Sequence, residues 1–151
     1  MRAVIQRVNQ AKLDIDSETY STIGKGLVLF LAVSDDDTQE DLDWLVKKIV
    51  AMRIFSNAEG KFDKSLKELE AELLIVSQFT LFASTKKGNR PSFIKSGAPV
   101  FAEQMYEKAI TCFQNQLGKN KVKTGKFGHN MQVSLENDGP VTIILDSKQK
   151  E

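Results

Sequence analysis

Two uninterrupted apolar runs dominate the pattern of hydrophobic and polar positions along this chain. Residues 27–33 carry no polar side chain, and the stretch 73–82 begins in the same way. Such runs are typical of strands buried on both faces, because a half-buried strand alternates apolar and polar positions. The second run turns polar at Ser77, Gln78 and Thr80. We predict a central strand over 73–82 whose end holds a rigid polar site; the competing interpretation is a core strand whose hydroxyl groups bond to nearby backbone.

Two other stretches have the 3.6-residue period of helices that bury one face. The first follows the acidic run 35–37, and the second begins at Pro99 and ends at Leu117 before a glycine. We expect the acidic run to cap the first helix, because carboxylates stabilise a helix N-terminus. A metal site is the alternative, but the run lacks the ligand spacing of a calcium loop.

The remaining apolar positions predict several further strands and one dense turn. The strands are expected over 2–16, 122–128, 131–136 and 141–145, with the turn at 137–140, a turn or short strand at 17–23, and a loop with one short helical turn at 61–72. Residues 1–151 are therefore expected to form a single α/β domain. Its three layers, α/β/β, have mixed but largely antiparallel strands and two main helices on one side. The tail 148–151 is expected to be frayed.

Composition narrows the possible environments. The 151 residues are 41% hydrophobic and 27% charged, with a net charge of +1 and a single cysteine. These values predict a globular chain without an internal disulfide, and nothing in them indicates a nucleic-acid or membrane partner. Charge interrupts the amino terminus too early for a signal peptide, and no apolar run reaches the roughly 20 residues of a membrane span. We expect a cytoplasmic protein.

One loop departs from this near-neutral balance. Between residues 83 and 99, Lys86, Lys87, Arg90 and Lys95 occur without any acidic residue. The loop is either an ordinary exposed segment or a surface that contacts phosphates without reading sequence.

The residue types available for catalysis leave the chemistry unassigned. With one histidine and one cysteine, a zinc site would need several carboxylates, and neither common phosphate-binding glycine loop is present. A catalytic triad would have to use His129. Thr80 could act as a nucleophile, but no evident base lies beside it in the sequence. We expect no metal and no cofactor.

Two motifs, however, resemble the paired signature of the D-aminoacyl-tRNA deacylase family. They are Ser-Gln-Phe-Thr-Leu at 77–81 and Asn-Asp-Gly-Pro-Val-Thr at 137–142. Further blocks at 1–8, 87–93 and 124–128 resemble that family in the same order, so the resemblance covers essentially the whole chain. The two motifs together are far more specific than either one alone.

The resemblance implies a homodimer without a cofactor that hydrolyses the ester between a D-amino acid and the terminal ribose of tRNA. It also implies removal of glycine mischarged on tRNA-Ala. The Gly139–Pro140 peptide bond would be cis, with carbonyl groups that enter the partner subunit's pocket. These carbonyls would exclude an L side chain, whereas glycine has no side chain to exclude.

The same resemblance assigns roles to single residues. Ser77, Gln78, Phe79 and Thr80 would form the catalytic segment, with main-chain N–H groups around Gln78 and Phe79 facing the scissile carbonyl. Phe79 would also pack near the terminal adenine. Either Thr80 or the 2′-hydroxyl of the ribose would assist the attacking water, and the lack of a base beside Thr80 favours the 2′-hydroxyl.

Other residues are expected to surround the substrate. The resemblance places Ala102, Phe127, Gly128 and Met131 in the pocket, with Arg7 bracing the segment 127–128. If the basic loop contacts tRNA phosphates, then Lys86, Lys87 and Arg90 are its candidate residues. For each of these positions the simpler interpretation is ordinary packing or exposure. A non-catalytic tRNA- or RNA-binding module and a purely structural dimerisation domain remain the alternatives for the whole chain.

Overall fold

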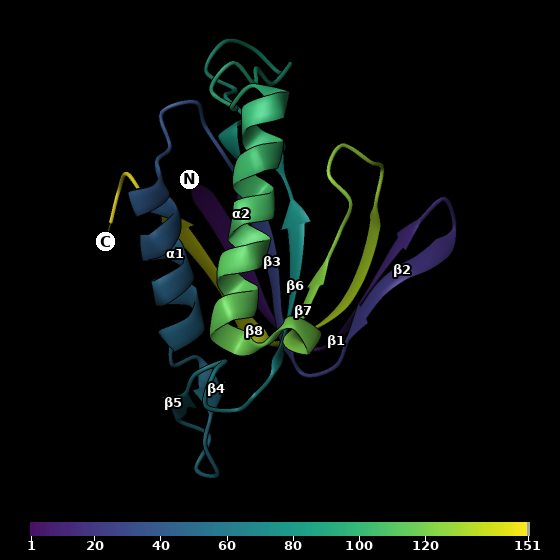
Figure 1. Cartoon of the computed structure of the whole chain (residues 1–151), viewed down its shortest axis with the longest axis vertical. Helices are drawn as coiled ribbons and strands as arrows, with labels where there is room; N and C mark the ends of the chain where they lie inside the picture. The colour runs from purple at the N-terminus through teal and green to yellow at the C-terminus, as the bar shows by residue number, and fades with distance from the viewer. Residues whose placement is uncertain (151) are drawn as a thin grey trace.

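The computed structural model describes residues 1–150 as one mixed sheet with two helices on one of its faces (Figure 1). The helices are α1 (Gln39–Ala51) and α2 (Pro99–Leu117), and two 3₁₀ turns are η1 (Phe79–Phe82) and η2 (Lys119–Lys121). The strands are β1 (Arg2–Ile15), β2 (Glu18–Ile23), β3 (Gly26–Ala32), β6 (Glu72–Ser77), β7 (Val122–Thr124) and β8 (Gln132–Asp146), while β4 (Phe55–Ser56) and β5 (Phe62–Lys64) form a separate small pair.

The long strand β1 organises the sheet. It pairs antiparallel with β2, β3 and β8. On the other side of β3, strand β6 runs parallel to both β3 and β7. Leu31 near the end of β3 therefore lies opposite Ser77 at the end of β6, so the carboxyl ends of both strands meet at one edge of the sheet.

Two apolar clusters occupy the two faces of this sheet. Leu73 and Ile75 of β6 belong to the cluster that also holds the buried residues of α1 and α2. Leu74 and Val76 belong to the cluster on the other face, with residues of β1, β2 and β3. All four side chains are at most 2% exposed. The expected α/β domain and its doubly buried central strand are confirmed.

Several predicted boundaries are wrong. The strand expected over 73–82 ends at Ser77, and the chain turns into η1 because Leu81 donates its N–H to the Gln78 carbonyl and Ala83 donates to the Thr80 carbonyl. The strands expected at 131–136 and 141–145 are one strand, β8, and the turn signal at 137–140 marks an interruption within it.

The acidic run 35–37 does not cap α1. Thr38 is the residue before the helix, and its N–H donates to the Asp41 carboxylate at 2.8 Å. Asp37 instead accepts from the amino terminus of Met1 and from the Ser34 N–H, while Asp35 accepts from the N–H of Ala98. The cap prediction was wrong because these carboxylates have partners far away in the sequence.

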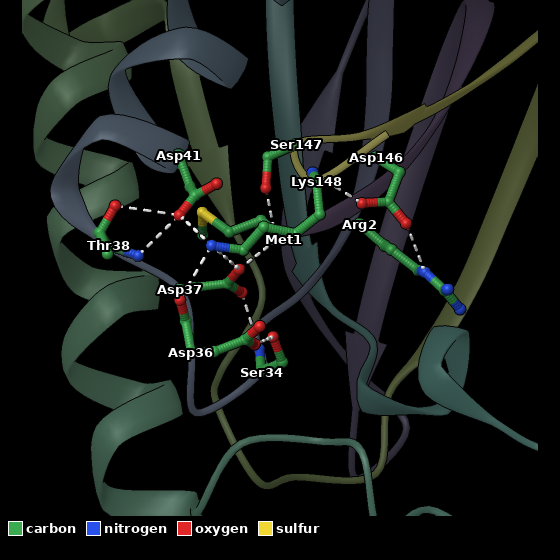
Figure 2. A network of polar contacts seen from close by, with 10 residues as sticks. All are labelled: Met1, Arg2, Ser34, Asp36, Asp37, Thr38, Asp41, Asp146, Ser147 and Lys148. Carbon is green, nitrogen blue, oxygen red and sulfur yellow. Dashed lines mark hydrogen bonds and ion pairs between the residues drawn. The ribbon is translucent and has the colours of Figure 1, made fainter. Parts of the chain in front are cut away.

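The start of the tail has partners in the fold, and Figure 2 shows Lys148 among them. The Lys148 ammonium donates to the Asp41 carboxylate at 2.7 Å and to the Asp36 carbonyl at 2.9 Å. Lys150 places its ammonium 5.3 Å from the ring centroid of Trp44. Fraying of the tail stays a prediction, and Glu151 lies outside the described residues.

Candidate functional site

A cavity of about 300 Å³ opens where the carboxyl ends of β3 and β6 meet the start of α2. Its surface is mainly apolar. Six of the residues expected at the site line it together: Ser77, Gln78, Phe79, Ala102, Phe127 and Gly128. The parallel pairing of β3 with β6 makes this possible, because it brings two strand ends to the same place.

Backbone donors at the mouth of this cavity differ in availability. The N–H of Gln78 continues the sheet and donates to the Leu31 carbonyl at 2.8 Å. Within residues 1–150, the N–H groups of Phe79 and Thr80 have no acceptor. The first N–H groups of a helical turn have no acceptor within that turn, so this adjacent pair is available to a ligand. Of the two donors expected from the sequence, Gln78 is therefore occupied and Phe79 is free.

The hydroxyl group of Thr80 contacts an amide. The Gln78 side chain donates to Thr80 Oγ1 at 2.6 Å. An amide is not a base, so this contact holds the hydroxyl in place without activating it. Among residues 1–150, no carboxylate, imidazole or amine bonds to Thr80 Oγ1, and Thr80 is not among the residues that line the cavity.

The ring of Phe79 stands at the cavity mouth and is 57% exposed. It meets Phe93 edge to face, with ring centroids 5.1 Å apart. Phe93 belongs to the basic loop, and Ser96 of the same loop donates its hydroxyl to the Phe79 carbonyl at 3.0 Å. The loop is closed on itself by paired backbone hydrogen bonds between Ser84 and Ser92. It therefore packs directly against the segment that carries the free N–H groups.

Three of the four cations of this loop lie at its tip, between Ser84 and Ser92. Lys86, Lys87 and Arg90 are exposed, and none of them forms an ion pair within residues 1–150. They are free to contact a polyanion close to the cavity.

Tyr106 is a cavity residue that the sequence did not single out. Its hydroxyl donates to the Ile75 carbonyl at 2.8 Å, and its ring centroid lies 5.9 Å from that of Phe127. Burial raises the pKa of the Tyr106 hydroxyl far above its ordinary value, so the group stays a neutral donor. Tyr106 thus ties α2 to β6 and supports the Phe127 wall of the cavity.

The end of β3, the residue after it, the end of the basic loop and the start of α2 supply further lining residues that were missed. They are Leu31, Ala32, Val33, Ser96, Gly97 and Pro99. Gly97 is the one with a signal in the sequence, since glycine allows a close approach of backbone: a Cβ there would lie 3.3 Å from the Val33 carbonyl oxygen.

The Gly139–Pro140 peptide bond is cis, as expected. Both residues are exposed, and neither lines the cavity of its own chain. The pairing of β8 with β1 passes from Val8↔Asn137 to Gln6↔Thr142, so residues 138–141 bulge out opposite a single residue of β1. The bulge presents Gly139 and Pro140 at the surface of the molecule.

Arg7 is that single residue, and its contacts within the chain lie at the bulge. Its Nε lies 2.9 Å from the Asp138 carboxylate, and a second nitrogen donates to the Ile54 carbonyl. Asn137 in turn donates its side-chain amide to the Arg7 carbonyl at 2.9 Å. Arg7 is buried and braces the bulge at 138–141, and bracing of the segment 127–128 stays a prediction. Its partner was missed because the bulge is far from Arg7 in the sequence and reaches it through strand pairing.

Met131 lies away from this cavity. It packs with the apolar cluster on the face of the sheet that carries no helix. A Cβ added to Gly125 would lie 2.5 Å from the Met131 sulfur, so Met131 lies close against Gly125. It is not among the residues that line the cavity.

A wider and more polar groove of about 650 Å³ adjoins the cavity at Phe127. It runs beside α2 and β7 and includes His129, whose Nδ1 lies 3.0 Å from the Phe127 carbonyl. It contains no residue of the two sequence motifs.

Comparisons with known proteins agree with the two motifs. The family model described as D-Tyr-tRNA(Tyr) deacylase matches residues 4–146. The chain belongs to this family. A deacylase is a hydrolase, so family membership makes the chain an enzyme, and the resemblance inferred from the motifs is confirmed.

Individual relatives match over their full length. The chain is 53% identical over 150 residues to a D-aminoacyl-tRNA deacylase of Christiangramia forsetii, covering 99% of each chain. It is 52% identical over 151 residues to a protein of the same name from Cytophaga hutchinsonii, covering 100% of each.

Solved structures extend the comparison to the fold. One described as c-Myc DNA Unwinding Element Binding Protein is 40% identical, with a TM-score of 0.92 and coverage of 97% of this chain and 98% of the other. Another is described as "Structural Analysis of a probable eukaryotic D-amino acid tRNA deacylase". It has a TM-score of 0.86 at 21% identity and covers 95% of this chain and 97% of the other. At this sequence identity the comparison shows a shared fold and nothing further. No helix in residues 1–150 is both long and apolar enough to cross a bilayer.

Proposed function

We propose that this chain hydrolyses the ester bond that joins a D-amino acid to the terminal ribose of tRNA. The observation that carries the proposal is the pair of free N–H groups at Phe79 and Thr80 beside the apolar cavity. Ester hydrolysis passes through a tetrahedral intermediate whose oxygen carries negative charge, and paired backbone donors stabilise that charge. Each such donor is worth on the order of 10²–10³ in rate.

The surroundings of the donors suit an aminoacyl adenosine. The exposed ring of Phe79 offers a face on which the terminal adenine can stack. The cavity behind it is lined mainly by apolar groups, among them Ala102 and Phe127, and provides about 300 Å³ for the part of the substrate that enters.

Water activation falls to the substrate in this proposal. The hydroxyl of Thr80 is held by the Gln78 amide at 2.6 Å and lacks a base to remove its proton. The ribose 2′-hydroxyl next to the scissile ester is the remaining group that can orient the attacking water. It accepts a proton from that water while passing its own proton to the departing ribose oxygen. The protein then supplies position and charge stabilisation, and the substrate relays the proton.

Selection between D- and L-amino acids is assigned to a second subunit. The exposed bulge carries Gly139 and Pro140 away from the cavity of its own chain, and Arg7 and Asn137 hold its base rigidly. In a homodimer with twofold symmetry each chain inserts its bulge into the other's cavity, because such an interface is reciprocal. The carbonyl groups of the bulge then occupy the space that an L side chain needs.

Two consequences follow for substrates and partners. Glycine has no side chain to be excluded, so glycyl-tRNA-Ala is also a substrate. The cations at the tip of the basic loop, Lys86, Lys87 and Arg90, contact phosphates near the acceptor end. Substrates of this kind place the enzyme in the cytoplasm, where tRNA is charged.

The decisive experiment follows the ester itself. D-tyrosyl-tRNA and L-tyrosyl-tRNA, each labelled in the amino acid, are incubated with the protein, with glycyl-tRNA-Ala and L-alanyl-tRNA-Ala as a second pair. We expect accelerated loss of the D and glycyl esters and no acceleration for the two L esters. A non-catalytic RNA-binding module would slow the loss of every ester, and a purely structural dimerisation domain would leave all four unchanged.

A further inference from the structure

Arg2 connects the catalytic segment to the opposite end of the chain. Its Nη1 donates to the Leu81 carbonyl at 3.0 Å, and its Nε donates to the Asp146 carboxylate at 2.9 Å. The guanidinium carbon also lies 4.8 Å above the centroid of the Phe82 ring. One side chain thus contacts the last two residues of η1 and the last residue of β8, and Figure 2 shows the Asp146 contact.

The short turn η1 depends on contacts of this kind. One turn of 3₁₀ helix fixes several backbone angles for very few hydrogen bonds, so it is marginal by itself. Two side chains from distant parts of the sequence bind its carbonyl groups: Ser96 donates to Phe79, and Arg2 donates to Leu81. The free N–H groups of Phe79 and Thr80 lie in the same turn, so their direction depends on how these carbonyls are held.

Arg2 is itself rigidly placed. The amino group of Met1 is fully buried and donates to the Asp37 carboxylate and, at 2.7 Å, to the Ser147 hydroxyl. The second oxygen of Asp146 accepts from the Lys148 N–H at 2.9 Å, so both carboxylate oxygens are occupied. The backbone on both sides of the Arg2–Asp146 pair is therefore fixed.

We propose that Arg2 is a positioning residue, which sets the direction of the free N–H groups of Phe79 and Thr80 through its bonds to Leu81 and Asp146. The inference rests on the proposed deacylation. The effect of Arg2 on the reaction is indirect, since Arg2 does not line the cavity. A displacement of about 1 Å in a catalytic arrangement can cost on the order of 100-fold in rate.

A role in positioning is separable from a role in stability. The Arg2 side chain is 37% exposed, and ion pairs near the surface add little to the free energy of unfolding. Lys148 is a suitable control, because it also forms an ion pair in this network, with Asp41, but within residues 1–150 none of its hydrogen bonds or ion pairs reaches η1. Removing Lys148 therefore disturbs the same region without touching the catalytic turn.

The experiment compares Arg2→Ala, Arg2→Lys and Lys148→Ala with the unchanged protein. Hydrolysis of D-tyrosyl-tRNA is followed in single turnovers over a range of enzyme concentrations. This series separates the maximal rate from the enzyme concentration that gives half of that rate. The Tm of each protein is measured as well. For Arg2→Ala we expect a maximal rate lower by about 10- to 100-fold, with half-saturation changed by less than about threefold because tRNA binding is spread over many other contacts.

The two other variants decide the interpretation. Lysine keeps the charge but lacks the planar fork, so it can serve Leu81 or Asp146 but not both, and Arg2→Lys should restore part of the rate. Lys148→Ala should lower Tm and leave the maximal rate unchanged. An unchanged rate in Arg2→Ala, or an equal loss of rate in Lys148→Ala, overturns the inference. Failure of the unchanged protein to hydrolyse D-tyrosyl-tRNA overturns the proposed function instead.

Discussion

A single hydrogen bond of Gln78 decides which donors remain for chemistry. Its N–H continues the parallel pairing of β6 with β3 by bonding to Leu31, and the chain turns immediately afterwards. The next two N–H groups, on Phe79 and Thr80, therefore leave the sheet without a partner. The two free donors therefore result from the position at which β6 ends.

The side chain of Thr80 is predicted to be dispensable for most of the rate. Because its hydroxyl contacts an amide and no base, Thr80→Ala removes neither a nucleophile nor a proton acceptor, whereas its backbone N–H stays. General-base and nucleophilic groups contribute on the order of 10²–10⁴ in rate, so we expect a loss of less than about tenfold. Single-turnover deacylation of D-tyrosyl-tRNA measures it, and complete loss of activity in a folded variant would assign the reaction to Thr80.

Gly139 is predicted not to tolerate a side chain. A Cβ at this position would lie 2.1 Å from the Val141 backbone nitrogen, so Gly139→Ala must rearrange the bulge. If the bulge completes the partner's cavity, we expect deacylation to fall by about 100-fold. Gly24→Ala is the matched control, because its Cβ would meet only a Glu72 side-chain oxygen at an ordinary 3.5 Å. Equal activity of both variants would separate the bulge from the reaction.

At the scale of elements, the basic loop is a folded unit attached to η1. Backbone bonds between Ser84 and Ser92 close it, and Phe93 and Ser96 pack against Phe79. The cations at its tip are thereby held near the cavity mouth, so the loop can guide a polyanion without entering the reaction.

Neutralising the loop tip is predicted to weaken tRNA binding without changing the chemistry. The triple variant Lys86→Ala, Lys87→Ala, Arg90→Ala should reduce the slope of log affinity against log salt by about 2–3, since each phosphate contact contributes about 0.7–0.9. The maximal rate at saturating enzyme should stay the same. The control removes three exposed cations far from the cavity, Lys25, Lys47 and Lys67, and should leave the salt slope unchanged. A slope that is equal in both triple variants would remove the loop from the tRNA interface.

At the scale of the whole molecule, the two ends of the chain are joined in one ionic network. Met1, Arg2 and Lys148 meet carboxylates from the β3–α1 connection, from α1 and from the end of β8 (Figure 2). Through the bond from Arg2 to the Leu81 carbonyl, this network also reaches η1.

The network predicts a loss of stability in acid. Burial disfavours the charged form of Asp41, but hydrogen bonds from Lys148 and Thr38 outweigh burial and hold its pKa well below its ordinary value. Because the folded pKa is lower than the unfolded value of about 3.9, Asp41 stabilises the fold above that value and the contribution is lost as the pH falls through the folded pKa.

Asp41→Asn should therefore lower Tm at neutral pH and flatten the acid dependence. Hydrogen bonds to a charged group contribute about 2 kcal/mol, which corresponds to roughly 4–8 °C for a domain of this size. Thermal melts from about pH 7 down to about pH 1.5 measure both effects, because the contribution of Asp41 is lost only below the unfolded value of about 3.9. Glu40→Gln, an exposed neighbour in the first turn of α1, is the control and should keep the steep dependence of the unchanged protein. Parallel curves for all three proteins would show that Asp41 does not drive the acid response.

The sequence alone determined the α/β class, the buried central strand, the family and six of the residues that line the cavity. These features depend on local pattern, because a run of apolar residues is buried wherever it lies and a motif keeps its residues side by side. The tertiary structure decided which distant groups meet. Arg7 bonds to Asp138, and Asp37 bonds to Met1 instead of capping α1. These partners depend on strand order and register, which place groups together that no local pattern relates.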